Sequence, residues 1–268
     1  MDLPSADTFG QRHDASELTR LGQTLGMECA AFGFNLDFAP VADVRSNPEN
    51  TVIGDRAYSG DPGRAADAAA WVDGGMREAG IISVWKHFPG YGNTATDSHQ
   101  ALPVVELSRE DWARGDAVPF RRAVECGAPA VMAGHIRMTA FDPEYPASLS
   151  HVLVSEVLRE ELGFTGVVCT DDLTMGAISD TYGMGEAAVL AVEAGCDLLL
   201  VCHGADNLTQ ARQALLGAVD GGRISPARLE ESVYRILALK AEYGLTNQTV
   251  EAPDVAALNQ AVQALLGE

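Results

Sequence analysis

The sequence is poor in basic residues and has no long apolar run. It contains 18 Lys and Arg against 38 Asp and Glu, which gives a formal net charge of −20 over 268 residues. A surface this acidic repels nucleic acid and anionic membranes, so neither is expected as a partner. No apolar run reaches the roughly 18 residues that a transmembrane helix needs, so no membrane-spanning segment is predicted. Polyanionic substrates are also disfavoured unless local cations collect them.

The sequence also lacks a disulfide framework and a cofactor fingerprint. Its five cysteines, at positions 29, 126, 169, 196 and 202, are odd in number and have no metal-site spacing, which indicates a reducing compartment. No signal peptide is visible, and we expect a cytoplasmic protein. Cys169, Cys196 and Cys202 lie in or beside apolar runs and are predicted to be small core residues. Neither a cofactor nor a metal is expected.

What the sequence does contain is a concentration of reactive side chains in residues 86–99, KHFPGYGNTATDSH. The apolar run at 81–85 leads into it, as in a buried strand that delivers side chains at its C-terminal end. Proline and glycines then open a loop. Asp97 lies two residues before His99 and can accept a hydrogen bond from its ring, which keeps the imidazole basic. A loop in which both residues only cap backbone groups is the structural alternative.

Apolar runs alternate with helix-like segments, which predicts a parallel sheet in an α/β fold. Five runs are typical of strands, at residues 34–41, 81–87, 129–136, 166–170 and 196–202. Helices are expected at residues 16–32, 64–79, 108–126, 150–162, 185–194, 207–218 and 225–243. Residues 1–14 are expected to be irregular, and Pro119 is expected to interrupt its helix. The last twenty or so residues are polar, and a weak helix is expected from Asp254 onward.

Polar residues follow each predicted strand at one edge of the sheet. They are Asp43, Lys86 with His87, His135, Asp171 with Asp172, and His203. This convergence favours a (β/α)8-type TIM barrel, in which functional groups collect at the C-terminal ends of the strands. A doubly wound open sheet would also alternate, but no GxGxxG turn follows a first strand. One barrel domain is assigned to residues 1–246 and a tail to residues 247–268.

The carboxylate pair Asp171 and Asp172 allows several interpretations. The two residues could bind a metal together with His135 and His203, cap a helix, or supply a nucleophile with its neighbour. The cap suits Asp172, which opens a turn, whereas Asp171 should point into the barrel mouth.

Joining these elements gives a specific chemistry. A carboxylate nucleophile and a proton shuttle on opposite sides of a bond are what retaining glycoside hydrolysis requires. The carboxylate attacks the anomeric carbon, the shuttle protonates the departing oxygen, and water then hydrolyses the covalent intermediate. Here Asp171 would be the nucleophile, and His99 with Asp97 behind it would be the shuttle.

KHFPGYGNTATDSH followed by LGFTGVVCTDDLTM resembles glycoside hydrolase family 3, and more narrowly its exo-β-N-acetylglucosaminidases (β-hexosaminidases) of bacterial cell-wall recycling. Supporting stretches are LDFAPVADV, GDRAYSGDP, PASLS, LREELGF and SVYRILALK. The resemblance runs from about residue 3 to residue 245. The D-x-H loop is its diagnostic part, because family relatives that hydrolyse glucosides generally lack it.

The resemblance implies a role for each matching residue. Asp171 would be the nucleophile, His99 the general acid/base, and Asp97 the group that orients and polarises it. Sugar hydroxyls would be bound by Arg56, Lys86 and His87. Two alternatives stay open: Arg56 could pin its own loop to an acidic neighbour, and Lys86 could be an ion-pair partner inside the barrel. His135 is expected to be a supporting or core residue rather than a catalytic one.

The sequence departs from the family pattern in three places. Tyr91 stands where the family often has a second His, and Thr170 replaces a common Ser; both changes are expected to be tolerated. The family also places two barrel strands before the segment that matches residues 3–6, and neither those strands nor their sugar-binding Asp is present. The barrel is therefore expected to lack its first two strands, which exposes sheet edges. A truncated chain, a misassigned start and self-association that covers the gap are all compatible with this departure.

The predicted function is removal of terminal N-acetylglucosamine from peptidoglycan-derived glycosides. Phosphorolysis of the same bond is an alternative, because a neutral His repels phosphate less than a carboxylate does. A β-glucosidase or xylosidase of the same family is a second, and a Schiff-base aldolase using Lys86 is a third. A non-catalytic sugar-binding form is the fourth.

Overall fold

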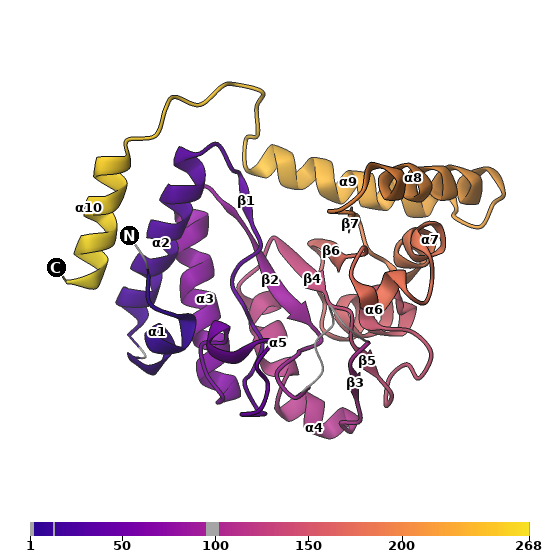
Figure 1. Ribbon diagram of the computed structural model, residues 1–268, viewed down its shortest axis with the longest axis horizontal. Helices are drawn as coiled ribbons and strands as arrows, with labels where there is room; N and C mark the ends of the chain where they lie inside the picture. Colours follow the sequence, from indigo (N-terminus) through magenta and orange to yellow (C-terminus); the bar gives the residue numbers. More distant parts are fainter. Residues whose placement is uncertain (1–2, 13, 95–101, 268) are drawn as a thin grey trace.

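The centre of the molecule is a parallel sheet, as the sequence predicts. The structure is a computed structural model that describes residues 3–12, 14–94 and 102–267. Its main sheet has the order β1-β2-β4-β6-β7, and all four pairings are parallel (Figure 1). The strands are β1 (Leu36–Asp37), β2 (Ile82–Phe88), β4 (Ala130–Ala133), β6 (Val167–Asp172) and β7 (Leu198–Leu200). The sheet is curled but open, so the α/β class is confirmed and a closed eight-stranded barrel is not seen in the described residues.

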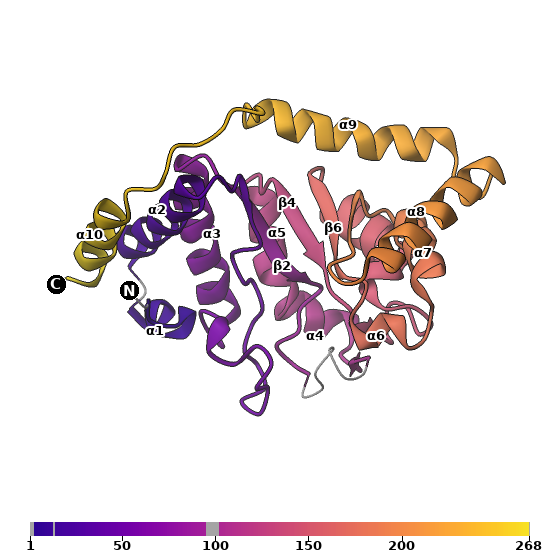
Figure 2. The same cartoon turned by 45° about the horizontal axis from the view of Figure 1, so that its top comes forward.

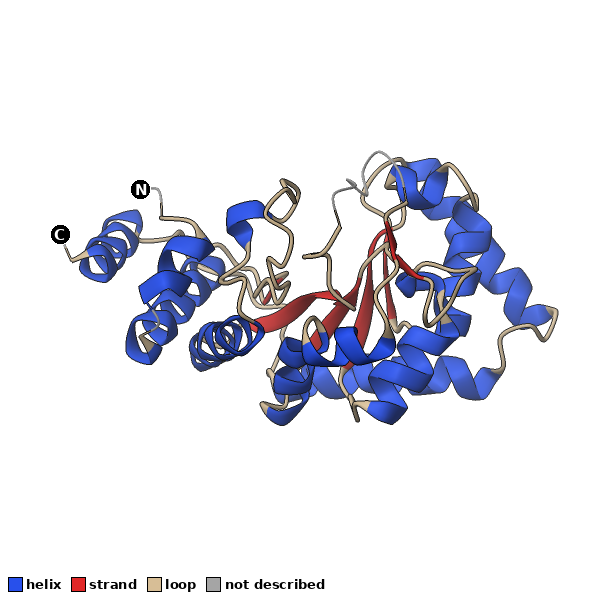
Figure 3. Cartoon of the chain, turned by 90° about the horizontal axis from the view of Figure 1, so that it is seen from below, coloured by secondary structure: helices blue, strands red, loops and turns tan. Residues whose placement is uncertain are grey.

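Helices cover the outer side of the curled sheet (Figure 3). They are α2 (Ala15–Ala31), α3 (Pro62–Glu78), α4 (Arg109–Arg114), α5 (Ala117–Glu125), η3 (Val152–Glu161), α7 (Met184–Ala194) and α8 (Ala205–Asp220). Phe88 of β2 packs edge-on against Trp112 of α4 and Phe120 of α5, with ring centroids 6.4 and 5.2 Å apart. Burial of these large rings anchors β2, the strand that delivers Lys86 and His87.

The inner side of the sheet is also apolar. Alternate residues of the strands point inward, and Val84, Met132 and Cys169 form one buried cluster. Part of this cluster is covered by Ile236 and Leu239 of α9 (Pro226–Glu242). Figure 2 shows α9 crossing the sheet at the ends where the strands begin, which leaves the opposite ends free for polar side chains.

Several helix starts follow capping rules that are visible in the sequence. Asp14 accepts hydrogen bonds from Ser16 and Glu17 at the start of α2. Asp61 and Ser225 cap α3 and α9, and in both helices proline follows the cap directly. The three helices therefore begin within a few residues of the positions predicted from the sequence.

The structure differs from the sequence-based expectation at the N-terminal segment and agrees with it near the C-terminal end. Residues 1–14 were expected to be irregular, but Ala6–Arg12 forms α1, whose Phe9 is buried. The assigned tail contains α10 (Val255–Leu266), which lies beside α2 (Figure 1). Leu265 of α10 joins the cluster around α2, and the Arg20 guanidinium donates to the Ala264 carbonyl at 2.6 Å. The expectation for residues 1–14 was wrong because burial of Phe9 against α2 outweighs weak local propensity. The helix expected from Asp254 is confirmed.

The middle of the chain holds two further differences. The helix expected at 108–126 breaks at Gly115 between α4 and α5, not at Pro119. Pro119 lies in the first turn of α5, where the backbone N–H has no helical partner to lose. A small second sheet pairs β3 (Val104–Val105) with β5 (Arg137–Met138). None of the helices in the described part of the chain is both long and apolar enough to cross a membrane.

Candidate active site

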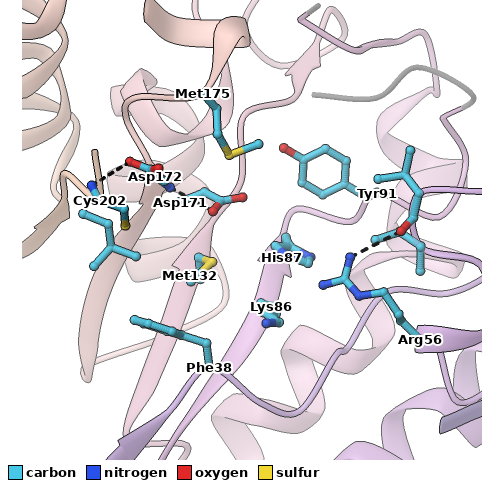
Figure 4. Close-up of a pocket in the computed structure, with 13 residues that line it drawn as sticks. Phe38, Arg56, Lys86, His87, Tyr91, Met132, Asp171, Asp172, Met175 and Cys202 are labelled. Atoms are coloured by element: carbon cyan, nitrogen blue, oxygen red, sulfur yellow. Dashed lines mark hydrogen bonds between the residues drawn. The ribbon is translucent and has the colours of Figure 1, made fainter. Parts of the chain in front are cut away.

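One cavity lies where β2 and β6 end, and it brings together most of the residues singled out from the sequence. It has a volume of about 250 Å³. Its lining comprises Phe38, Val52, Ile53, Arg56, Lys86, His87, Tyr91, Met132, Asp171, Asp172, Met175, Leu200 and Cys202 (Figure 4). Arg56, Lys86, His87 and Asp171 therefore share one site, as predicted. Asp97 and His99 lie outside the described residues.

Asp171 presents a carboxylate to this cavity. One of its oxygens, Oδ1, accepts a hydrogen bond from the backbone N–H of Asp172 at 2.8 Å. No hydrogen bond to Oδ2 is recorded within the described residues. Figure 4 shows the Asp171 side chain across the cavity from Arg56 and Tyr91. A carboxylate with one oxygen fixed and the other directed into a cavity is suited to attack on a bound electrophile.

Asp172 organises the turn that follows β6. Its Oδ1 accepts from the backbone N–H groups of Thr174 and Cys202, both at 3.0 Å, and its Oδ2 accepts from the Thr174 hydroxyl at 2.6 Å. Burial alone would raise the pKa of Asp172, but these hydrogen bonds lower it. Asp172 thus opens a turn, as predicted, but it does not cap a helix, because α6 (Gly176–Ser179) begins after Met175 without a side-chain cap. Cys202 itself is exposed, so its assignment to the core was wrong, whereas Cys169 and Cys196 are buried.

His135 supports the same turn through a hydrogen bond to its backbone. A backbone carbonyl can only accept, so Nε2 of His135 donates to the Asp172 carbonyl at 2.9 Å. Nδ1 then accepts from the Ser148 hydroxyl at 2.7 Å. The imidazole is fully buried, and burial lowers its pKa. His135 is thus a supporting residue, and among the described residues no group of three or more His, Cys, Asp or Glu is arranged to hold a metal.

Lys86 and Arg56 supply positive charge to an otherwise acidic protein. Lys86 is half-buried, and its pKa is lowered by burial and by the charge of Arg56, against the opposing effect of Asp37 and Asp171. No carboxylate in the described ranges forms an ion pair with either side chain. The Arg56 guanidinium donates to the Val52 carbonyl of its own loop at 3.3 Å. Both cations can therefore donate hydrogen bonds to a ligand.

His87 is held by a buried carboxylate that the sequence marked only as a strand-end residue. Nδ1 of His87 lies 2.8 Å from Oδ2 of Asp43, and Oδ1 of Asp43 accepts from the backbone N–H of Tyr91 at 2.6 Å. The exposed fraction of the Asp43 side chain is 0%. The peptide between Lys86 and His87 is cis. Position after a predicted strand was the only sequence signal for Asp43.

Both the sequence and the fold of the chain are similar to those of known proteins. Residues 2–239 match the family model described as the glycosyl hydrolase family 3 N-terminal domain. The chain belongs to glycosyl hydrolase family 3. The resemblance inferred from the sequence motifs is thereby confirmed.

Relatives within family 3 are similar over almost the whole chain. A β-hexosaminidase from Nitrosomonas eutropha is 32% identical across 97% of this chain and 77% of that protein. A solved β-N-acetylglucosaminidase from Paenibacillus sp. str. FPU-7 has a TM-score of 0.92 and 40% identity, over 99% of this chain and 52% of that one. A β-glucoside phosphorylase, BglX, has a TM-score of 0.89 and 28% identity, over 97% of this chain and 49% of that one. The chain thus spans about half the length of these two solved relatives.

A second buried acid of this family 3 chain lies near Asp43 without lining the cavity. Asp116 is 4% exposed, and its Oδ1 has no hydrogen-bond partner among the residues that the structure describes. It packs beneath Gly90, whose φ of +121° and missing side chain leave room for it. Burial, and then the charge of Asp43, raise the pKa of Asp116 to about 7.

This raised pKa predicts a loss of stability as the pH rises. The unfolded carboxyl titrates near pH 4, so the native state binds the proton more tightly and loses stability between about pH 4 and pH 7. Asp116→Asn removes this titration. The free energy of unfolding of the variant minus that of the wild type should therefore be about 2–3 kcal/mol more positive at pH 8 than at pH 5. Urea unfolding of both proteins at pH 5 and pH 8 measures this difference. The same difference at both pH values would contradict the raised pKa of Asp116.

Proposed function

We propose that the chain is a retaining exo-β-N-acetylglucosaminidase with Asp171 as its nucleophile. The observation that carries this proposal is the convergence of the Asp171 carboxylate with Arg56, Lys86 and His87 around one cavity. A carboxylate faced by hydrogen-bond donors suits a neutral, hydroxyl-rich ligand whose anomeric carbon becomes electrophilic. Membership of family 3 and similarity to named β-hexosaminidases support the same reaction.

In the proposed mechanism, Oδ2 of Asp171 attacks the anomeric carbon while the bond to the leaving oxygen breaks. The Asp172 N–H holds Oδ1, so the attacking oxygen is oriented before the substrate arrives. His99 gives its proton to the leaving oxygen, and Asp97 stabilises the imidazolium before proton transfer. Water then attacks the glycosyl-aspartate, His99 takes the proton of that water, and the Asp171 carboxylate is released.

Lys86, Arg56 and His87 are proposed to bind the hydroxyl groups of the sugar. Lys86 and Arg56 can only donate hydrogen bonds, which matches the hydroxyl oxygens as acceptors. The substrates are proposed to be peptidoglycan-derived fragments met in the cytoplasm. All five cysteines are unpaired, in keeping with a reducing compartment.

Rates on matched aryl β-glycosides test the proposal. We expect the highest kcat/KM on 4-nitrophenyl N-acetyl-β-glucosaminide, at least about tenfold above the β-glucoside and β-xyloside. Proton NMR of the first-formed sugar should show the β-anomer, because two displacements retain configuration. A faster β-glucoside would favour a glucosidase, and sugar binding by calorimetry without turnover would favour a binding protein.

Phosphorolysis is a second candidate. The two cations that line the cavity could attract phosphate, and the similar structure of a β-glucoside phosphorylase supports this alternative. In that reaction a phosphate oxygen, in place of water, attacks the glycosyl-aspartate. Assays in phosphate and in a neutral amine buffer separate the two reactions, since only phosphorolysis yields the sugar 1-phosphate.

A further inference from the structure

We infer that Asp43 is a positioning residue that makes His87 a hydrogen-bond acceptor toward the cavity. A carboxylate can only accept, so the His87 nitrogen that faces it carries the hydrogen. That nitrogen is Nδ1, 2.8 Å from Oδ2 of Asp43. In a neutral imidazole the other nitrogen, Nε2, then has a free lone pair. The substrate part of this inference rests on the proposed function, whereas the tautomer itself does not.

The surroundings of His87 hold its imidazole in the hydrogen bond with Asp43. Asp43 is completely buried, and the side chain of His87 is only 9% exposed. The ring of His87 packs edge-on against Tyr91, with centroids 5.2 Å apart. Since the second Asp43 oxygen is occupied by the Tyr91 N–H, the carboxylate cannot rotate away without losing a buried hydrogen bond.

Asp43 is also held in place by a contact between two loops. The Asn50 side chain donates to the Tyr91 carbonyl at 2.7 Å, and the Asn47 N–H donates to the Gly92 carbonyl at 3.1 Å. A Cβ on Gly92 would lie 1.5 Å from the Val44 carbonyl oxygen, so only glycine permits this approach. These contacts hold the backbone of Tyr91 and Gly92 in place. The Tyr91 N–H in turn holds the Asp43 carboxylate.

An acceptor at this position gives the cavity a recognition pattern that its cations cannot supply. Lys86 and Arg56 are donors only, so they satisfy the oxygen of a sugar hydroxyl but not its hydrogen. Nε2 of His87 can accept that hydrogen. Hydroxyl groups that accept from a cation and donate to His87 would be distinguished from fluorine or ether groups, which cannot donate.

Asp43→Asn is the decisive variant because it keeps the shape and reverses the polarity. The Asn oxygen can still accept from the Tyr91 N–H, while the amide nitrogen donates to Nδ1 of His87. Nε2 must then carry the hydrogen. Long-range ¹⁵N–¹H NMR at pH 8, assigned with His87→Gln, should show Nδ1–H in the wild type and Nε2–H in the variant.

The wild-type spectrum decides the tautomer even if the variant fails to fold. An Nε2–H or doubly protonated His87 in the wild type would overturn the inference. An unchanged tautomer in folded Asp43→Asn would overturn it as well. Asp142→Asn is the matched control: Asp142 is also buried and accepts from two backbone N–H groups, but it does not line the cavity. This control should leave the His87 tautomer as in the wild type.

Substrate analogues test the consequence for recognition. Aryl N-acetylglucosaminides with fluorine in place of the 3-, 4- or 6-hydroxyl accept weakly and cannot donate. The wild type should lose about tenfold or more in kcat/KM for one of them, whereas Asp43→Asn should lose less than about threefold for the same analogue. Equal fluorine penalties in both proteins would overturn the recognition step. Absence of turnover on every N-acetylglucosaminide would instead count against the proposed function and leave the NMR result standing.

Discussion

Asp171→Ala is expected to lower release of 4-nitrophenol from the aryl N-acetyl-β-glucosaminide by at least about 10³-fold, equivalent to roughly 4 kcal/mol of transition-state stabilisation. The variant keeps the sugar contacts but has no oxygen to form the covalent intermediate. An aryl leaving group needs little protonation, so the loss reports on the nucleophile. Steady-state kinetics measure it, with circular dichroism confirming that the variant is folded.

Added azide sharpens this test. A small anion can occupy the space left by the carboxylate and attack the anomeric carbon directly as nitrophenolate leaves. A single displacement inverts configuration, so the product should be the α-glycosyl azide. Asp180→Ala is the control, because Asp180 is exposed on the segment after β6 and does not line the cavity. Turnover of Asp171→Ala within tenfold of this control would exclude Asp171 as the nucleophile.

Asp197→Ala is expected to destabilise the fold by about 3–5 kcal/mol without involving the cavity. The Asp197 carboxylate is completely buried at the start of β7. It accepts from Arg159 and Ser232, each at 2.6 Å, from Arg235 at 3.1 Å and from the Val168 N–H at 3.0 Å. Its removal leaves guanidinium groups without a counter-charge, which is more costly than losing an exposed ion pair.

Glu186→Ala supplies the matched comparison for Asp197. Glu186 also pairs with an arginine, Arg223, at 2.7 Å, but the two side chains are 48% and 42% exposed. Solvent screens this pair, and its loss should cost no more than about 1 kcal/mol. Urea unfolding of both variants at pH 7 gives the comparison. Similar losses in the two variants would show that Asp197 does not hold β6, β7 and α9 together.

Much of the fold could be predicted from local sequence patterns. Alternation of apolar runs with capped helices predicted the parallel sheet. Strands that are buried on both faces are apolar, and the crossover connections between parallel strands are usually helices. Residues whose structure depends on distant partners were less predictable. Residues 6–12 are helical in the structure since Phe9 is buried beside α2, and local propensity does not contain that information.

The candidate site also has features that the sequence predicts and features that depend on tertiary contacts. The sequence by itself determined which side chains end the strands: Lys86, His87 and Asp171 share one cavity because parallel strands end at one edge. Only the tertiary structure decided that Asp43 holds His87, that the Asp172 N–H and side chain order the turn at Asp171, and that Cys202 is exposed. Such contacts depend on distances between segments that are far apart in the sequence, and residue type and spacing do not specify those distances.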